Sequence, residues 1–302
     1  MSTETPISFK CNDQQLFGIL HCPEVPQRSG VLIVVGGPQY RVGSHRQFVL
    51  LARYLCNMGI PVFRFDYRGM GDSEGNLAGF ENVEDDILAA IDTFYEYSEN
   101  LRHVSLWGLC DAATAIAFYG HKDSRVKKLV LLNPWVRSEA GLAKAYLKTY
   151  YLGKLMSTYT WKRLVTGDLD IREGIKSLGG HIKQVFGGPG NRAKYNPVGN
   201  KKSGFQQGQQ KDISPPLDKR LFYGLQHFKG SVLIILSGND LTAEEFKNTL
   251  KENRGYRRIL GRSNTTILNI ADADHTFSRR HWSAEMEKLS LEWLIEPNET
   301  QN

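Results

Sequence analysis

Short apolar runs and amphipathic stretches alternate along most of the chain. The apolar runs are largely continuous, as expected for strands that are buried on both faces, and they span 31–37, 61–67, 103–108, 128–134, 231–238 and 265–270. The stretches between and after them have the apolar spacing of helices, over 45–59, 81–98, 111–121 and 284–295. Two further β-rich runs within 7–22 predict an opening antiparallel pair. This order predicts an α/β fold in which a mostly parallel sheet has helices on both faces.

The alternation is interrupted once, by a long insertion between the fourth and fifth of these runs. A single crossover helix would need far fewer residues. We therefore expect a core formed by 1–136 and 230–302, with a cap insertion at 137–229. The first part of the cap, 139–165, is aromatic-rich and has a helical pattern. The part around 187–216 is rich in Gly, Gln and Lys, a composition typical of disordered loops.

Composition narrows the class of protein further. A chain of 302 residues, 41% hydrophobic and 23% charged, suits one large domain with an insertion. Its apolar runs are shorter than the roughly 20 residues that span a bilayer, so no transmembrane segment is expected. The N-terminus lacks the basic and apolar regions of a secretory signal, which predicts a cytoplasmic protein. The oligomeric state stays open.

The cysteines show no metal-binding or disulfide spacing. They occur without any C-x-x-C pair, at Cys11, Cys22, Cys56 and Cys110. We therefore expect neither a structural zinc site nor a disulfide framework. The sequence also lacks H-E-x-x-H, a P-loop and a dinucleotide fingerprint after the first parallel strand, so no metal or cofactor is expected.

Positive charge is concentrated in the cap. Residues 137–229 contain 17 Lys and Arg against 6 Asp and Glu, whereas the rest of the chain contains 21 against 26. One interpretation is a solvated face and a soluble loop. The other is a basic lid that attracts an anionic substrate, such as an acyl-coenzyme A, an acidic sugar or a phosphorylated carrier. No nucleic-acid-binding motif accompanies the charge, so no nucleic-acid partner is expected.

Two segments compete for the role of a catalytic nucleophile. The sequence GDSEG at 71–75 fits the pattern G-x-S-x-G around Ser73. A nucleophile elbow, however, is a sharp turn that leads directly from a strand into a helix. Ser73 lies several residues beyond the preceding strand and is followed by EGNLAGF instead of a helix. We therefore interpret Ser73 as a loop residue.

The second segment, SLWGLCDAA, places Cys110 at the end of a strand and at the start of an Ala-rich helix. Gly108 and Ala112 are the small residues that an elbow needs two positions before and two positions after its nucleophile. A helix N-terminus lowers the pKa of a thiol and favours the reactive thiolate. Cys110 is therefore the candidate nucleophile, and the alternative is a structural cysteine buried at a strand end.

The partners of such a nucleophile follow it in the order acid, then histidine. Asp240 follows the apolar run that ends at 238, and His275 follows the run that ends at 270. Each therefore lies beyond the carboxyl end of a strand, where catalytic residues collect in open α/β sheets. His275 would exchange protons with Cys110, and Asp240 would hold the imidazole in position.

Other residues near this pair are rivals. Asp272 and Asp274 lie beside His275 and are alternatives either for the acid or for a helix cap, and His281 is a weaker candidate for the base. Asp66, in the loop FDYRGMGDSEG, is expected to have a structural role in which its carboxylate pairs with Arg68.

The oxyanion hole should combine two backbone N–H groups. The first is that of Asp111, directly after the nucleophile. The second comes from the loop GGPQYRVGSHRQF, where Pro38 has no N–H, so Gly37 is the expected donor and Gln39 the alternative. The same loop supplies most candidates for substrate binding, although a helix N-cap by Ser44 explains part of it equally well. These candidates are Gln39, Tyr40, Arg41, His45 and Trp135.

The motifs together resemble those of a known superfamily. FDYRGMGDSEG is similar to the D-x-R-G-x-G-x-S-x-G loop found across the α/β-hydrolases, and the elbow cysteine resembles that of dienelactone hydrolase. More narrowly, GGPQYRVGSHRQF, LWGLCDAA, LLNPWVRSEAGLAKAYLKTYYL and ADHTFS resemble the first of the two hydrolases encoded with bacterial exosortase A systems. The resemblance implies an α/β-hydrolase fold and a cytoplasmic bacterial enzyme connected with exopolysaccharide production. It implies no established substrate.

Three functions are compatible with these residues. The first is a hydrolase that forms a thioester acyl-enzyme on Cys110 from an ester, thioester or lactone, with a small or carrier-linked acyl group. The second is an acyltransferase that passes the same acyl group to a hydroxyl or an amine. The third is a binding protein that keeps the hydrolase fold without catalysis.

Overall fold

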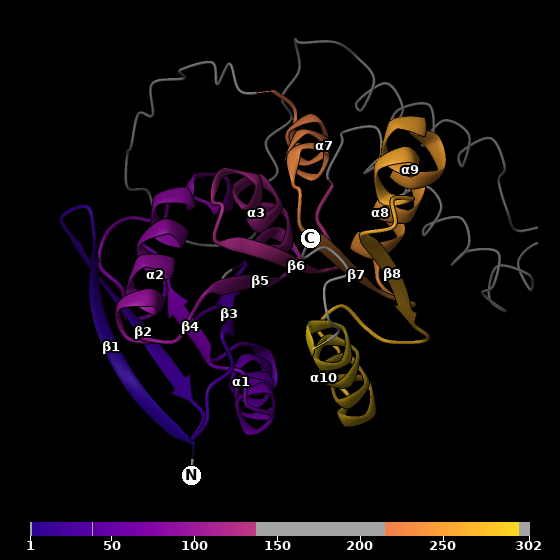
Figure 1. Cartoon of the computed structure of the whole chain (residues 1–302). Coiled ribbons are helices and arrows are strands. Elements are labelled where there is room, and N and C mark those ends of the chain that lie inside the picture. The colour runs from indigo at the N-terminus through magenta and orange to yellow at the C-terminus, as the bar shows by residue number, and fades with distance from the viewer. Residues whose placement is uncertain (1, 38, 137–214, 296–302) are drawn as a thin grey trace, which may run out of the picture. The chain divides into compact units, whose positions relative to one another are not determined.

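The computed structural model describes residues 2–37, 39–136 and 215–295 (Figure 1). The chain divides into two compact units, the first formed by 1–138 with 216–302 and the second by 139–215. The expected cap, including its helical first part and its loop, falls outside the described residues apart from the segment that begins at 215.

The described residues of the first unit contain an eight-stranded sheet in the order β1-β2-β4-β3-β5-β6-β7-β8. The strand β2 pairs antiparallel with β1 and with β4, and all later neighbours pair in parallel. The strands are β1 (Thr3–Cys11), β2 (Gln14–Cys22), β3 (Ser29–Val34), β4 (Val62–Asp66), β5 (His103–Leu109), β6 (Val126–Leu132), β7 (Ser231–Ser237) and β8 (Thr265–Ile270). This confirms the α/β-hydrolase fold expected from the sequence.

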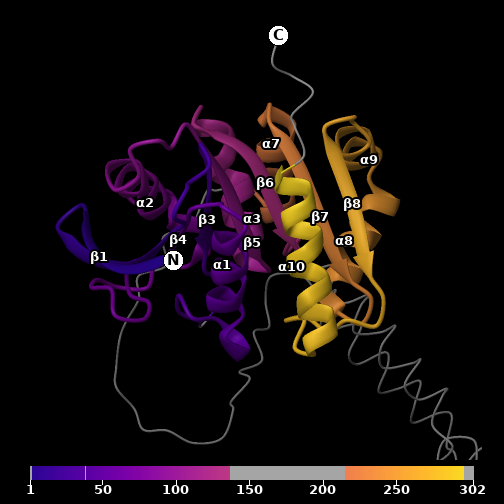
Figure 2. The same cartoon turned by 60° about the horizontal axis from the view of Figure 1, so that its bottom comes forward.

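Helices cover both faces of this sheet. In Figures 1 and 2, α1 and α10 lie together on one face, and α2, α3 and α7 lie on the other. The two remaining helices, α8 and α9, connect β7 to the edge strand β8. The helices are α1 (Gln47–Asn57), α2 (Glu84–Glu96), α3 (Asp111–Tyr119), α7 (Leu217–His227), α8 (Leu241–Glu252), α9 (Arg254–Leu260) and α10 (Arg280–Ile295). Within the described residues, three short 3-10 helices occur at Ser44–Arg46, Phe80–Asn82 and Gly120–Lys122.

Burial along each strand explains the pattern of apolar residues from which the strands were predicted. Every residue of β4 is buried, and so is nearly every residue of β3, β5, β6 and β7, because these central strands have helices on both sides. In β1 and β2 buried and more exposed positions alternate instead, as in an antiparallel pair with one face toward solvent. The edge strand β8 is mostly half-buried.

Three helices, α7, α8 and α9, were not expected from the sequence. Several other helices and strands begin or end a few residues from their expected positions. It assigned 217–227 to the cap, but α7 belongs to the unit that holds the sheet and packs on α3. The packing is close, since a Cβ at Gly224 would lie 2.1 Å from the carbonyl oxygen of Ala117. The missed helices α8 and α9 follow Asp240 and Asn253, whose side chains accept backbone hydrogen bonds as N-caps.

Among the described residues, no helix has both the length and the apolar composition that a membrane span requires.

The loop after β4 holds the serine of the GDSEG motif in a structural role. The hydroxyl of Ser73 donates to the carbonyl oxygen of Asp66 at 2.6 Å and accepts from the N–H of Phe17 at 3.0 Å. Both hydrogen bonds tie the loop to the adjoining strands, so the hydroxyl is used for structure.

The expected pairing of Asp66 with Arg68 is wrong. The Asp66 carboxylate is fully buried and accepts from the backbone N–H of Arg41 at 2.5 Å and from its guanidinium. Arg68 turns the other way and pairs with Asp86 on α2 at 2.8 Å. The Arg41–Asp66 pair therefore joins the loop that follows β3 to the end of β4, because Arg41 lies in that loop and Asp66 is the last residue of the strand.

The burial of Asp66 leads to a prediction about stability. Arg41 pairs with both Asp66, which is fully buried, and Asp72, whose side chain is 67% exposed. Asp66→Asn should lower the free energy of unfolding by about 2–3 kcal/mol, because it leaves a largely buried guanidinium without its main partner. The matched change Asp72→Asn should cost less than about 1 kcal/mol, since exposed pairs are screened by solvent. Urea unfolding of the two variants measures both values, and equal losses would contradict the proposed importance of the buried pair.

Candidate active site

Cys110 occupies the sharp turn between β5 and α3. Its backbone has φ 63° and ψ −121°, a conformation that L-residues rarely adopt. The Cys110 N–H donates to the carbonyl oxygen of Leu132 at 2.8 Å, which fixes the turn to β6. A Cβ at Gly108 would lie 2.8–2.9 Å from the backbone of Ala112, so the turn requires the small residue expected there. The local sequence thus forms a strained strand–turn–helix with a partly exposed thiol.

Asp240 and His275 meet beyond the ends of β7 and β8. The Asp240 carboxylate lies 3.0 Å from Nδ1 of His275 and is 7% exposed. It also caps α8 by accepting from the N–H groups of Thr242 and Ala243, at 3.3 and 3.0 Å. The helix therefore fixes the carboxylate before any substrate arrives.

The imidazole of His275 joins this acid to the cysteine. Its Nδ1 faces Asp240, and the ring also makes a side-chain hydrogen bond with Cys110. The hydrogen bond that the ring donates to Asp240 raises the pKa of His275 most strongly, followed by the hydrogen bond with Cys110, and burial opposes both. The result is a pKa of about 10. At neutral pH the ring is therefore an imidazolium placed between a carboxylate and a sulfur.

The rival residues are engaged elsewhere or point to solvent. Asp274 accepts hydrogen bonds from the backbone N–H and the hydroxyl of Ser278, so it caps the following turn. Asp272 is exposed and has a positive φ of 58°. His281 is exposed, and its ring contacts Trp282 at 5.0 Å between ring centroids. Of the carboxylates considered, Asp240 is the one paired with His275.

Sequence reasoning missed a buried polar network beneath the site. Asn133, fully buried at the end of β6, donates to the carbonyl oxygen of His275 at 3.1 Å and to the hydroxyl of Ser237 at 2.8 Å. Its amide oxygen accepts from the N–H of Ser237, also at 2.8 Å. The Ser237 hydroxyl in turn donates to the carbonyl oxygen of Asp274 at 2.9 Å. The available signal was an asparagine directly after a buried strand, in the motif LLNPW.

The N–H of Gly37, one of the two expected oxyanion donors, already has an acceptor. The N–H of Gly37 donates to Oδ2 of Asp111 at 2.9 Å, and the N–H of Ala112 donates to Oδ1 at 2.9 Å. Burial raises the pKa of the Asp111 carboxyl above its ordinary value, although the N–H groups of Gly37, Ala112 and Asp111 itself oppose this rise. Asp111 thus brings a carboxylate as well as an N–H to this place, and the sequence analysis had considered only its N–H.

Of the expected substrate-binding residues in the loop after β3, two make contacts within the protein and two are exposed. Arg41 is used in the buried pair with Asp66, and Gln39 accepts a hydrogen bond from the N–H of Ser44 at 3.3 Å. Ser44 is not a helix cap, since α1 begins at Gln47 and has no side-chain cap. Tyr40 is 47% exposed and His45 is exposed, so both remain accessible.

Trp135, the remaining candidate for substrate binding, is half-buried beside the elbow. Its N–H donates to the carbonyl oxygen of Cys110 at 3.3 Å. Its own carbonyl oxygen accepts from the hydroxyl of Thr114 at 2.8 Å. Its backbone therefore fixes the segment after β6 to the start of α3, which keeps the tryptophan next to the candidate nucleophile.

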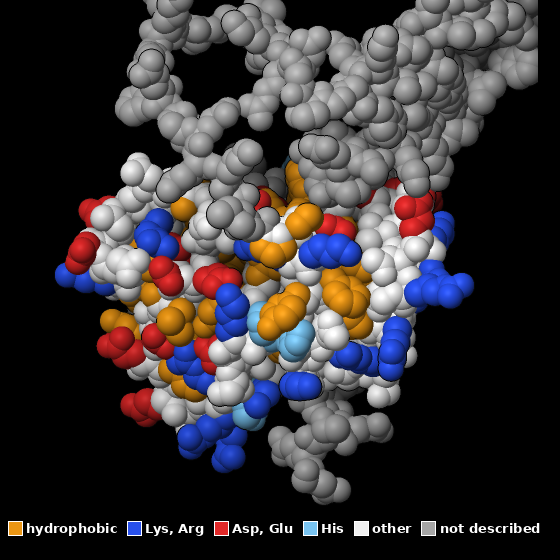
Figure 3. All heavy atoms as spheres, turned by 90° about the horizontal axis from the view of Figure 1, so that it is seen from above, with side chains coloured by type: hydrophobic (Ala, Val, Ile, Leu, Met, Phe, Trp, Pro, Cys, Tyr) orange, Lys and Arg blue, Asp and Glu red, His pale blue; other side chains and the backbone are white. Residues whose placement is uncertain are grey.

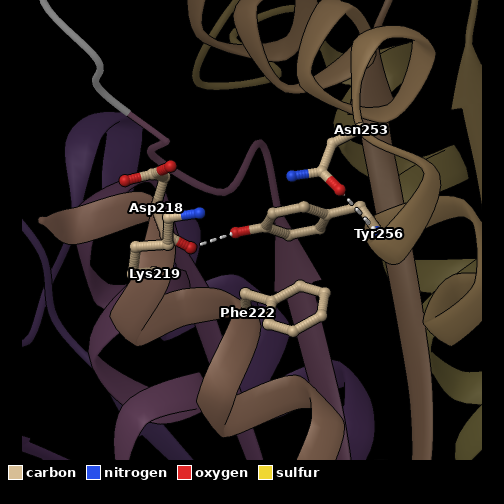
Figure 4. Close-up of a pocket in the computed structure, with 5 residues that line it drawn as sticks. All are labelled: Asp218, Lys219, Phe222, Asn253 and Tyr256. Atoms are coloured by element: carbon tan, nitrogen blue, oxygen red, sulfur yellow. Dashed lines mark hydrogen bonds between the residues drawn. The ribbon is translucent and has the colours of Figure 1, made fainter.

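A small cavity of about 120 Å³ lies between α7 and the start of α9, and none of Cys110, Asp240 and His275 lines it. Figure 4 shows Tyr256 across it, with its hydroxyl donating to the carbonyl oxygen of Asp218 at 2.6 Å. Its lining consists of Asp218, Lys219, Phe222, Asn253 and Tyr256. None of these is a candidate catalytic residue. Among the described residues there is no group of three or more His, Cys, Asp or Glu side chains that could hold a metal ion.

Solved structures of several hydrolases share this fold. An esterase of Pyrococcus furiosus aligns at a TM-score of 0.61 and 15% identity, over 97% of this chain and 90% of its own. A dienelactone hydrolase of Anabaena variabilis aligns at 0.58 and 13%, over 97% of each chain. Est1E of Butyrivibrio proteoclasticus, solved with ferulic acid bound, aligns at 0.58 and 13%, over 96% of this chain and 98% of its own. At these identities the likeness shows the fold alone.

Sequence comparison adds the family. No curated protein matches the chain. The family described as "Serine aminopeptidase, S33" matches residues 27–179, about half of the chain, which includes β3 to β6 and the turn at Cys110. The name of that family refers to a serine nucleophile, whereas the elbow of this chain carries Cys110. On this match the chain belongs to the serine aminopeptidase S33 family of α/β-hydrolases.

Proposed function

We propose that the protein is a hydrolase that forms a thioester acyl-enzyme on Cys110. The observation that carries the proposal is the continuous array of Asp240, His275 and Cys110, joined by hydrogen bonds at the carboxyl end of the sheet. An ester, thioester or lactone is the proposed substrate. The esterases and the dienelactone hydrolase among the structures with the same fold support this choice of bond.

The array supplies each proton that the reaction requires. The sulfur of Cys110, paired with the imidazolium of His275, adds to the substrate carbonyl carbon and forms the C–S bond. When the tetrahedral intermediate collapses, the bond to the leaving group breaks and His275 donates its proton to that group. Neutral His275 then accepts a proton from water as the oxygen attacks the thioester. The acid is released, and the thiolate–imidazolium pair is restored.

The proposed biological setting follows from the sequence resemblance. Similarity to the hydrolases encoded with exosortase A systems supports a cytoplasmic role in exopolysaccharide metabolism. An anionic, carrier-linked acyl donor would fit the excess of Lys and Arg at 137–229, most of which lies outside the described residues. Figure 3 views the molecule from above, and on the described part of this face acidic and basic side chains occur together. This part of the surface therefore has no electrostatic potential of a single sign.

The role of the cysteine can be tested with p-nitrophenyl acetate and peptide mass spectrometry. Wild type and Ser73→Ala should both gain an acetyl group at Cys110, because Ser73 is a structural residue. Cys110→Ala should gain none at that position. Hydroxylamine should remove the acetyl group, since it cleaves thioesters and leaves the amides formed on lysine. An adduct on Ser73 in the wild type, or no adduct at Cys110 although a parallel sample shows that iodoacetamide alkylates this thiol completely, would refute the thioester intermediate.

The charge on His275 leads to a second prediction, measured by alkylation of Cys110 with iodoacetamide. At pH 7 the rate should fall at least about tenfold in His275→Ala, because the thiolate loses its neighbouring cation. Asp240→Asn should also slow alkylation. Without the carboxylate the pKa of His275 falls below about 10, so the ring loses its positive charge at a lower pH than in the wild type. The rates should converge above about pH 10, where a cysteine ionises without help.

The other thiols need a control in this experiment. Burial raises the pKa values of Cys11 and Cys56 to about 11, so both should react slowly. Cys22 is partly exposed, and a Cys22→Ser background removes its contribution. Equal rates for wild type and His275→Ala at pH 7 would show that the imidazole does not activate the cysteine.

A further inference from the structure

The carboxylate of Asp111 lies where an acyl substrate would place its oxyanion. In a nucleophile elbow the developing negative charge is bound by the N–H after the nucleophile and by an N–H from the loop after the neighbouring strand. Here these groups belong to Asp111 and Gly37. The Gly37 N–H already donates to the Asp111 carboxylate at 2.9 Å, and the N–H groups of Ala112 and Asp111 also stabilise it.

The surrounding backbone leaves room for this carboxylate. A Cβ at Gly36 would lie 2.1 Å from Oδ1 of Asp111 and 2.9 Å from the nitrogen of Ala112. Gly36 is buried and lies two residues after the end of β3, so the carboxylate rests against the glycine backbone of the loop. Burial raises the pKa of Asp111, and the contacts with backbone N–H groups and the charge of His275 oppose that rise. The position is therefore a built anion site that the chain fills with its own side chain.

The arrangement has a direct consequence for acyl chemistry. A carbonyl oxygen cannot accept from the Gly37 N–H while the Asp111 carboxylate holds that hydrogen bond. The oxyanion would also develop negative charge beside an existing anion. Loss of a single oxyanion donor costs about 100-fold to 1,000-fold in rate, so the site as it stands is poorly arranged for an ester that brings nothing except its carbonyl group.

We propose that Asp111 is a specificity-determining residue that a substrate must displace from the oxyanion hole before Cys110 can be acylated. The inference rests on the proposed function. Groups of the substrate remote from the carbonyl must provide the binding energy for this displacement, as they do for other costly steps in catalysis. Asp111 therefore selects larger, carrier-linked acyl groups and discriminates against short activated esters.

A purely structural role for Asp111 makes a different prediction. An acidic residue in the first turn of a helix stabilises that helix through its dipole. Removal of such a residue lowers stability without speeding any reaction at the neighbouring cysteine. The measurement must therefore separate the oxyanion hole from the reactivity of the thiolate itself.

Two reactions of Cys110 provide this separation. Acylation by p-nitrophenyl acetate forms an oxyanion, whereas alkylation by iodoacetamide occurs at a tetrahedral carbon and forms none. The ratio of the two rates at Cys110, in the Cys22→Ser background at pH 7, reports the oxyanion hole. Asp111→Ala should raise this ratio at least about tenfold over wild type. Asp111→Asn, which keeps the shape but removes the negative charge, should raise it by a smaller factor.

A matched control is Asp85→Ala, which removes an exposed acidic residue from the first turn of α2. Its ratio should equal that of wild type. If Asp111→Ala does not fold, Asp111→Asn decides the question. A ratio that is unchanged or lower in the folded Asp111 variants would overturn the inference. Failure of the proposed function looks different, since acylation at residue 110 would then be absent in every variant while alkylation proceeds.

Discussion

The strained turn at Cys110 is the constraint on which the rest of the site depends. A positive φ of 63° at a non-glycine residue persists only when the neighbouring structure enforces it. The hydrogen bond to Leu132 fixes the turn from β6, and the absence of a side chain at Gly108 lets α3 start directly above β5. The same turn points the thiol toward His275 and brings the N-terminus of α3 to the loop after β3.

Charge in the site is balanced around one imidazole. His275 lies between Asp240 and Cys110, and their hydrogen bonds keep its pKa at about 10 in spite of burial. Burial raises the pKa of Asp111 and the positive charge of His275 opposes that rise, so two carboxyl groups and the sulfur lie near one cation. A thiolate nucleophile and an occupied oxyanion hole are both consistent with this balance. Displacement of Asp111 by a substrate would change the electrostatics of the whole site, not only the access to one N–H.

Buried polar contacts hold the loops and strand ends around the candidate site in place. Asn133 connects the ends of β6 and β7 to the backbone of His275, and the pair of Arg41 with Asp66 joins the loop that follows β3 to the end of β4. Buried polar groups of this kind require their partners, because an unpaired one costs about 1–3 kcal/mol or more. The site therefore depends on residues that would never touch a substrate.

The sequence by itself determined the fold class and placed Cys110, and not Ser73, at a strand-to-helix turn, and it predicted Asp240 and His275 as candidate partners. These features are local: a buried strand is a continuous apolar run, and an elbow is a strand followed at once by a helix with small residues at fixed spacing. Only the tertiary structure decided that Asp66 pairs with Arg41 and that the Asp111 carboxylate binds the Gly37 N–H. Those contacts join residues 25 and 74 positions apart, and no local pattern encodes which side chain faces which donor across that separation.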